Sequence, residues 1–217
     1  MGTHTTRRSF ALLAALGALG VAAGCNIVAP VYYAVHGPDK VDPVYDLATT
    51  TPTVILVDDP GSTVGQRRLR AEIADSATNI LLQKGVSTNM IDPRPALALA
   101  TERVDGKPMS ITEIGKAVHA DVVVYVLLTE FTTSADGASN LPSASFRVKI
   151  LDTQTGQRLW PEDVQGAPIQ LRPKYGAGDF TSDPTAESKA EQDLADRCGL
   201  AIAQLFYRHE LPDSARR

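Results

Sequence analysis

The spacing of apolar residues changes from one segment of this chain to the next. Residues Thr53–Val57 form a short apolar run that ends at Asp58, which predicts a buried strand. Over Gly65–Lys84 the apolar residues recur at helical spacing, and Gly85 supplies a helix stop. Val86–Ile91 is less apolar, and its pattern predicts a second strand nearer the edge of a sheet.

The middle of the chain predicts two short helices and a central strand. Pro95–Arg103 is rich in Ala and Leu and favours a short helix. Ser110 and Glu113 have the spacing of a capping box, so we expect a helix over Ile111–His119. Val122–Leu128 follows at once and is apolar on both faces, which is typical of a strand in the middle of a sheet.

The last part of the chain predicts two more strands and a long helix. Ser145–Leu151 alternates polar and apolar residues, as a half-exposed strand does, and Gln157–Trp160 returns after a turn. Residues 161–184 are rich in Pro and Gly. Thr185–Tyr207 then carries an apolar stripe that includes Cys198, which predicts a helix with a buried structural thiol.

Together these elements predict an α/β chain of the α+β sandwich type. The first half has the order of parallel crossover units, and the second half has the order of a meander. We therefore expect a mixed sheet of about five strands with helices packed on it and a long C-terminal helix. A single globular domain should cover residues 53–211, followed by a frayed tail at 212–217.

Residues 1–24 have a different composition from the rest of the chain. They contain no acidic residue, and Arg7 and Arg8 precede an apolar run over Phe10–Gly24. A positive start, an apolar core and small residues at the exit are the layout of a signal peptide. As a helix the run would span about 22 Å, short of the roughly 30 Å core of a bilayer, so export is favoured over a transmembrane helix.

The exit of this segment, Val21-Ala22-Ala23-Gly24-Cys25, resembles the lipobox of bacterial lipoproteins. Ala22 departs from the Leu that is commoner there. The resemblance implies cleavage before Cys25, diacylglycerol on the Cys25 sulfur, and further acyl chains that hold the protein on a membrane. The alternative is an ordinary cysteine after a plain signal peptide.

Thr6-Arg7-Arg8-Ser9-Phe10 also resembles the twin-arginine export signal. Ala11 and Leu12 depart from the last two positions of that pattern. Two arginines also make any signal peptide positive, so the general route and the twin-arginine route both stay open.

Residues 25–52 are predicted to be a tether between the lipidated cysteine and the domain. Prolines that break regular structure occur along it: Pro30, Pro38, Pro43 and Pro52. The apolar and aromatic stretch Val31–Val35 is unlike a free linker. It either lies at the membrane–water interface, which tyrosines favour, or packs on the domain.

The composition narrows the classes of function. The chain has 217 residues, 43% of them hydrophobic, which is enough for a buried core. Its formal charge is −4, and it becomes −6 without residues 1–24, so no nucleic-acid partner is expected. Cys198 is the only cysteine besides Cys25, so lipidation leaves no intramolecular disulfide.

The order of elements, together with the lipoprotein-like start, resembles a group of envelope proteins. The residues that carry the resemblance are the strand Thr53–Val57 with the helix ending Leu81-Leu82-Gln83-Lys84-Gly85, the strand entry Ala120-Asp121-Val122-Val123-Val124, and the strand–turn segment Ile150–Gln157. The group comprises the curli-secretion channel lipoprotein, the penicillin-binding-protein activator lipoprotein and the N-terminal domain of the Tol–Pal translocation protein. It implies a domain over about residues 53–207 that binds envelope proteins or assembles, without catalysis.

The titratable residues do not predict a metal site or a cofactor. His36, His119 and His209 share no ligand spacing, and no cysteine pair accompanies them. His119 stands at the end of a predicted helix, where a positive charge is favourable.

One loop is a candidate ligand site. Asp58 and Asp59 follow the first strand, where α/β folds often place sites, and Ser62 and Thr63 precede a helix whose free N–H groups could hold an anion. The alternative is a plain turn with a helix cap at Ser62 or Thr63.

These observations predict a lipid-anchored, non-enzymatic protein on the periplasmic face of the outer or inner membrane. Its domain would bind or position other envelope proteins. The second hypothesis is an envelope protein that binds a small ligand or an anion through the loop after the first strand. A hydrolase with dispersed active-site residues is the third.

Overall fold

The computed structural model describes five stretches of the chain, namely residues 40–64, 67–104, 106–133, 142–172 and 184–210. Asp42–Arg208 form one compact unit. The described residues outside it are β1 (Lys40–Val41) and β9 (His209–Glu210), which pair as short antiparallel strands of a second unit.

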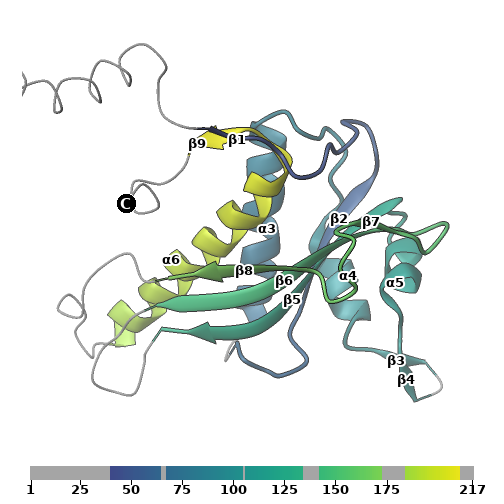
Figure 1. Ribbon diagram of the computed structural model, residues 1–217. Coiled ribbons are helices and arrows are strands. Elements are labelled where there is room, and N and C mark those ends of the chain that lie inside the picture. Colours follow the sequence, from purple (N-terminus) through teal and green to yellow (C-terminus); the bar gives the residue numbers. More distant parts are fainter. Residues whose placement is uncertain (1–39, 65–66, 105, 134–141, 173–183, 211–217) are drawn as a thin grey trace, which may run out of the picture. The chain divides into compact units, whose positions relative to one another are not determined.

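A mixed sheet of five strands lies at the centre of the compact unit. Its strands, from one edge to the other, are β2 (Thr53–Asp58), β5 (Val122–Thr132), β6 (Ser143–Asp152), and then β7 (Arg158–Trp160) and β8 (Ala167–Leu171), which both pair with β6. β2 and β5 are parallel, whereas the pairs made by β6 are antiparallel. Figure 1 shows this sheet with helices against it, which confirms the predicted α+β architecture.

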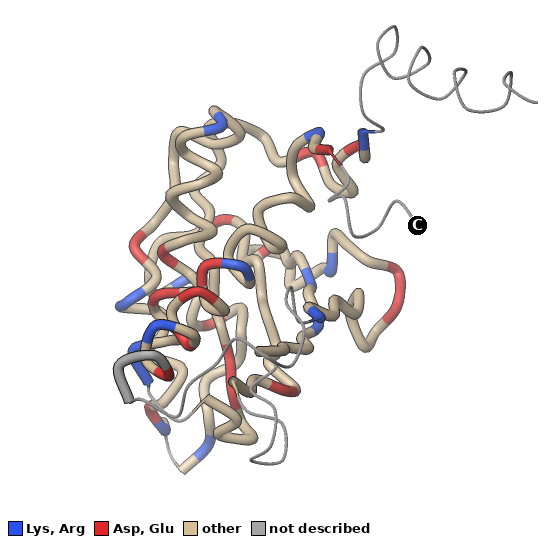
Figure 2. The backbone as a smooth tube through the Cα atoms, turned by 90° about the vertical axis from the view of Figure 1, so that its left-hand side faces the viewer, with Lys and Arg blue, Asp and Glu red and all other residues tan. Residues whose placement is uncertain are grey.

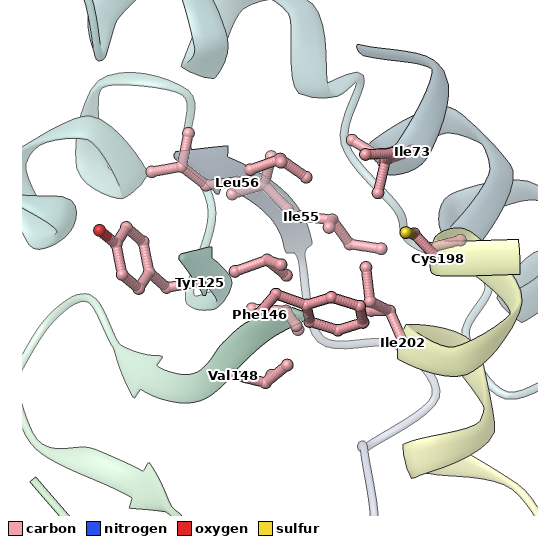
Figure 3. Close-up of a cluster of buried hydrophobic side chains, with 14 of the residues drawn as sticks. Ile55, Leu56, Ile73, Tyr125, Phe146, Val148, Cys198 and Ile202 are labelled. Atoms are coloured by element: carbon pink, nitrogen blue, oxygen red, sulfur yellow. The ribbon is translucent and has the colours of Figure 1, made fainter. Parts of the chain in front are cut away.

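Helices cover the sheet on both faces. The α-helices of the described residues are α3 (Arg67–Gln83), α4 (Pro93–Leu99), α5 (Ile111–Ala117) and α6 (Pro184–Ala203), and a short 3₁₀ turn, Gln204–Phe206, extends α6. On the face covered by α3 and α6, the core brings together Ile55, Ile73, Phe146, Cys198 and Ile202 (Figure 3). Leu56 and Tyr125 point to the opposite face, because successive strand residues alternate.

The helices α3 and α6 lie side by side and run in the same direction. Near their starts, Arg68 Nη2 donates a hydrogen bond of 3.3 Å to Ser188 Oγ. Further along, the backbone at Gly199 approaches Ser76 so closely that a Cβ atom at Gly199 would lie 2.5 Å from the Ser76 Cβ. Only glycine fits at this close approach of the two helices. Because the two contacts follow in the same order along both helices, α3 and α6 begin at the same end of the unit (Figure 1).

Several local predictions are confirmed. β5 lies inside the sheet, between β2 and β6, and its residues Val122–Val126 are buried. Ser110 Oγ accepts a hydrogen bond of 3.3 Å from the Glu113 N–H, and Glu113 Oε2 accepts one of 2.7 Å from the Ser110 N–H. This reciprocal pair is the predicted capping box at the start of α5.

The predicted strand over Val86–Ile91 is wrong. The segment makes a single parallel bridge, between Met90 and Thr53. The Thr88 N–H instead donates 2.8 Å to the Thr49 carbonyl, outside any ladder. The polar side chains of this stretch therefore bond to the backbone of the preceding loop, and the segment does not form a strand.

Two elements were not expected. β8 falls inside the Pro- and Gly-rich stretch, where Pro168 obscures the alternation of a strand. It lies at the sheet edge, the place where a missing N–H can face solvent. The other element is an exposed hairpin between α4 and α5, formed by β3 (Arg103–Val104) and β4 (Lys107–Pro108).

The compact unit begins earlier than the predicted domain boundary at Thr53. Leu47 is only 4% exposed, and the Val44 N–H donates 2.9 Å to the Leu205 carbonyl. The Tyr45 ring meets the Phe206 ring edge-on, with the ring centres 6.4 Å apart. Residues 42–52 therefore pack on the domain beside the end of α6 and are no free linker.

Within the described ranges, no helix combines the length and the apolar character needed to cross a membrane. Figure 2 shows positive and negative residues along much of the chain, with both signs present on the side facing the viewer.

Candidate functional site

The loop after β2 is closed on itself by a carboxylate. Asp59 Oδ1 accepts hydrogen bonds of 2.8 Å from the Thr63 N–H and 2.9 Å from Thr63 Oγ1, and Asp59 Oδ2 accepts one of 2.9 Å from the Val64 N–H. Ser62, at the tip, has a positive φ of 51°. The N–H groups of Thr63 and Val64 already donate to Asp59, so an anion at these two groups would have to displace that carboxylate.

Asp58 lies next to Asp59 but bonds to a different element. The Tyr125 hydroxyl of β5 donates a hydrogen bond of 2.7 Å to Asp58 Oδ2. Burial of the ring, followed by the hydrogen bond to Asp58 and its negative charge, raises the pKa of Tyr125 well above the usual tyrosine value. Tyr125 therefore stays protonated at neutral pH and acts as a donor that fixes Asp58.

Of the candidate loop residues, the structure brings together Asp59 and Thr63. Asp58 turns to the sheet, and the Ser62 N–H donates 3.1 Å to the Asp59 carbonyl. The two carboxylates thus serve separate structural bonds and do not converge on one point.

Cys198 is a buried structural thiol, as predicted. Its side chain faces the sheet among Ile73 and Ile202, with no exposed surface (Figure 3). Burial raises the pKa of Cys198 to about 12, against a smaller opposing effect of the Arg197 charge. The thiolate needed for nucleophilic or redox chemistry is therefore scarcely populated at neutral pH.

Two of the histidines, His119 and His209, belong to the described residues. His119 is exposed just beyond α5 with a φ of 60°, and His209 belongs to β9. Across the described stretches, no group of three or more His, Cys, Asp or Glu side chains is arranged to hold a metal ion.

The cationic residues of β6 lie half-exposed on the face opposite α3 and α6. Arg147 Nη1 donates 2.9 Å to the Gly166 carbonyl, which ties β6 to the turn before β8. Lys149 packs on the same glycine, because a Cβ atom at Gly166 would lie 3.0 Å from the Lys149 Cγ. Both side chains thus support the sheet edge.

The residues expected to direct and anchor the chain lie outside the described ranges. These are Arg7, Arg8 and Cys25, together with His36 and the stretch Val31–Val35. Their roles remain the expectations set by the sequence.

These features define an α+β sandwich in which Asp58, Asp59 and Tyr125 make structural hydrogen bonds. No family model matches the chain, and no curated protein matches it. Solved structures do resemble it. The PelC dodecamer from Paraburkholderia phytofirmans is 14% identical, with a TM-score of 0.47, over 79% of this chain and 97% of that one.

Two further solved structures are similar, and one of them is described as a lipoprotein. Lipoprotein GNA1162 from Neisseria meningitidis is 14% identical over 64% of this chain and 91% of its own, with a TM-score of 0.38. The LpoB C-terminal domain from Salmonella enterica is 17% identical over 58% and 85%, with a TM-score of 0.33. Likeness at these levels supports no conclusion about activity or partners.

Proposed function

We propose that this chain is a lipid-anchored protein of the cell envelope that binds or positions other envelope proteins without catalysing a reaction. The observation that carries the proposal is the N-terminal sequence, in which Arg7 and Arg8, an apolar run and Val21–Cys25 follow in the order of a lipoprotein signal. Cys25 would carry the lipid, and residues 26–41 would link it to the compact unit.

The geometry of the domain supports a binding role. The groups that could do chemistry have structural tasks: Asp59 closes a loop, Tyr125 and Asp58 bond to each other, and Cys198 fills the core. A domain whose polar groups have these structural roles can still bind a partner protein through its exposed surface.

The anchor is tested with a pair of cysteine variants. Cys25→Ser should move the protein from the membrane pellet to the soluble fraction and remove the mass of the acyl chains from the purified chain. Cys198→Ala is the matched control. It should keep both membrane retention and lipid mass, because that thiol lies in the core. Retention of Cys25→Ser with no loss of mass would refute the anchor.

The binding role needs a separate test in intact envelopes. A photo-crosslinking side chain is placed at exposed positions of the compact unit, with one buried position, Leu194, as the background control. Adducts with the same envelope protein from neighbouring exposed positions would support the proposal. Adducts no more frequent than at Leu194 would contradict it.

A further inference from the structure

The compact unit has one end at which the linker, residues 26–41, enters it. The unit begins at Asp42, and the Val44 N–H then donates 2.9 Å to the Leu205 carbonyl, just beyond α6. Because α3 and α6 run in parallel, the last turn of α3 lies at this same end of the unit (Figure 1). We call this part of the compact unit the entry end.

Large apolar side chains are exposed at six described positions, and three of these belong to the entry end. The six are Val44, Leu82, Val104, Leu159, Val164 and Leu200. Val44 and Leu82, which lies in the last turn of α3, are each 43% exposed. Leu200 lies in the last turn of α6, but the exposed Asp196 precedes it by one turn and makes its surroundings polar. Single exposed apolar residues are ordinary, so the argument needs more than exposure.

Tyr207 and two cations lie at the same end. The Tyr207 ring is half-buried, and Lys84 Nζ lies 5.5 Å from the ring centre. Arg208 Nε lies 3.1 Å from Asp42 Oδ1, and the Arg208 side chain is 65% exposed. Tyr, Lys and Arg side chains combine an apolar body with a polar tip, which suits the boundary between lipid chains and headgroups.

The charged residues around this surface have both signs. Lys84 and Arg208 are positive, whereas Asp42 and Asp46 are exposed and negative. Attraction to anionic lipid therefore needs no part in the argument. A membrane contact at the entry end would depend on the apolar side chains, which gain free energy when they leave water.

The linker keeps the entry end near the membrane. With Cys25 in the bilayer, the 16 residues 26–41 span at most about 55 Å when fully extended. The starts of α3 and α6 lie farther along the unit, because a helix of 20 residues, such as α6, is about 30 Å long. A short linker gives the entry end a high effective concentration at the lipid, so weak apolar contacts are sufficient.

We propose that Val44, Leu82 and Tyr207 form a lipid-contact surface, which holds the entry end of the compact unit against the bilayer. The apolar side chains would enter the boundary below the headgroups, while Lys84 and Arg208 keep their charges among the headgroups. The inference rests on the proposed function, because the lipid on Cys25 supplies the proximity. It sets the orientation of the domain, in which the starts of α3 and α6 face away from the membrane.

The test places a fluorophore at single positions of the full chain in phosphatidylcholine vesicles. Val44→Cys or Leu82→Cys is labelled with nitrobenzoxadiazole, and Cys198 escapes labelling because it is buried. Lipid that carries a nitroxide spin label should quench both fluorophores about twofold more than one at Val104→Cys. Val104 is the matched control, because it is 57% exposed on the β3–β4 hairpin, away from the entry end (Figure 1). Equal quenching at all three positions would overturn the proposal.

A charge variant tests whether the apolar side chains act together. Leu82→Glu should lower the quenching of the label at Val44→Cys about twofold, because a carboxylate is unfavourable in the bilayer. Val104→Glu makes the same change of charge on the hairpin and should leave that quenching unaltered. Quenching only when phosphatidylglycerol is added would overturn the proposal, because the contact would then depend on charge. Labels whose emission shifts without quenching would assign the surface to a protein contact instead.

A second arm separates this inference from the lipid anchor. A histidine tag replaces residues 1–25, and nickel-chelating lipid then holds the chain on the vesicles without an acyl chain. Stronger quenching at Val44→Cys and Leu82→Cys than at Val104→Cys should persist, and its loss on vesicle-bound chain would overturn the inference. Flotation of the lipidated chain beside Cys25→Ser tests the anchor alone, so the two proposals can fail independently.

Discussion

The loop before α3 and the first turn of α3 are neighbours in the sequence, yet they handle charge in opposite ways. In the loop, the one carboxylate of Asp59 takes three hydrogen bonds from Thr63 and Val64. In the helix, Arg67 and Arg70 make no polar side-chain contact with the described residues. The comparison teaches that a candidate site is better judged by which groups lack partners than by where polar residues gather.

The largest expected effect is at the helix crossing that brings the two helix starts together. Gly199→Ala would place a Cβ atom against Ser76 and force α6 away from α3, at a cost of about 2–3 kcal/mol in the free energy of unfolding. Urea unfolding measures the cost, and the exposed neighbour Leu200→Ala should change stability far less.

Asp59→Ala would remove the carboxylate that closes the loop. Loss of the three bonds should destabilise the domain by about 1–2 kcal/mol, as for a lost helix cap. Asp59→Asn keeps an acceptor and should cost less. If the anion-site hypothesis held instead, Asp59→Ala would free the N–H groups, and added phosphate would then raise the unfolding temperature of the variant.

Tyr125→Phe tests the bond to Asp58 and should cost about 1 kcal/mol at neutral pH. The raised pKa of Tyr125 means that the folded state holds the hydroxyl proton more tightly than the unfolded state. This stabilisation is complete below about pH 10, the unfolded value, and is lost as the pH rises beyond it. Chemical unfolding at neutral and alkaline pH should give Tyr125→Phe the flatter profile, and parallel profiles would contradict this account.

The smallest effect is expected from a single charge at the helix start. Arg67→Gln should raise the free energy of unfolding by about 0.3–0.5 kcal/mol at low salt, because it removes a cation from the positive end of α3. The gain should shrink in high salt. A loss of stability in low salt would show that Arg67 is balanced within the protein.

The sequence predicted the parts of the fold that depend on local pattern. Val122–Leu128 was recognisable as a central strand because it is apolar on both faces, and Ser110 with Glu113 as a cap because the spacing is fixed by helix geometry. β8 was missed because Pro168 breaks the pattern, and Val86–Ile91 was misassigned because its hydrogen bonds depend on Thr49, far away in sequence.

The candidate site was predictable only in part, because some of its contacts join residues that are far apart in the sequence. Asp59 and Thr63 were both identified as candidate residues of one loop, but the hydrogen bonds between the Asp59 carboxylate and Thr63 were not predicted. The arginines of α3 were visible in the sequence as charged positions of a helix. That Ser188 and the start of α6 lie beside them follows from the crossing at Gly199, which no local pattern encodes.

Pro168 at the sheet edge has a consequence for crowding. A lipid anchor would confine many copies to a thin layer, where the local concentration is high and exposed strand edges invite chain-to-chain polymerisation. β8 has no N–H at Pro168, and β7 is only three residues long, so this edge is a poor template for a neighbour's strand. With such an anchor, this irregular sheet edge would hinder fibre formation between neighbouring copies.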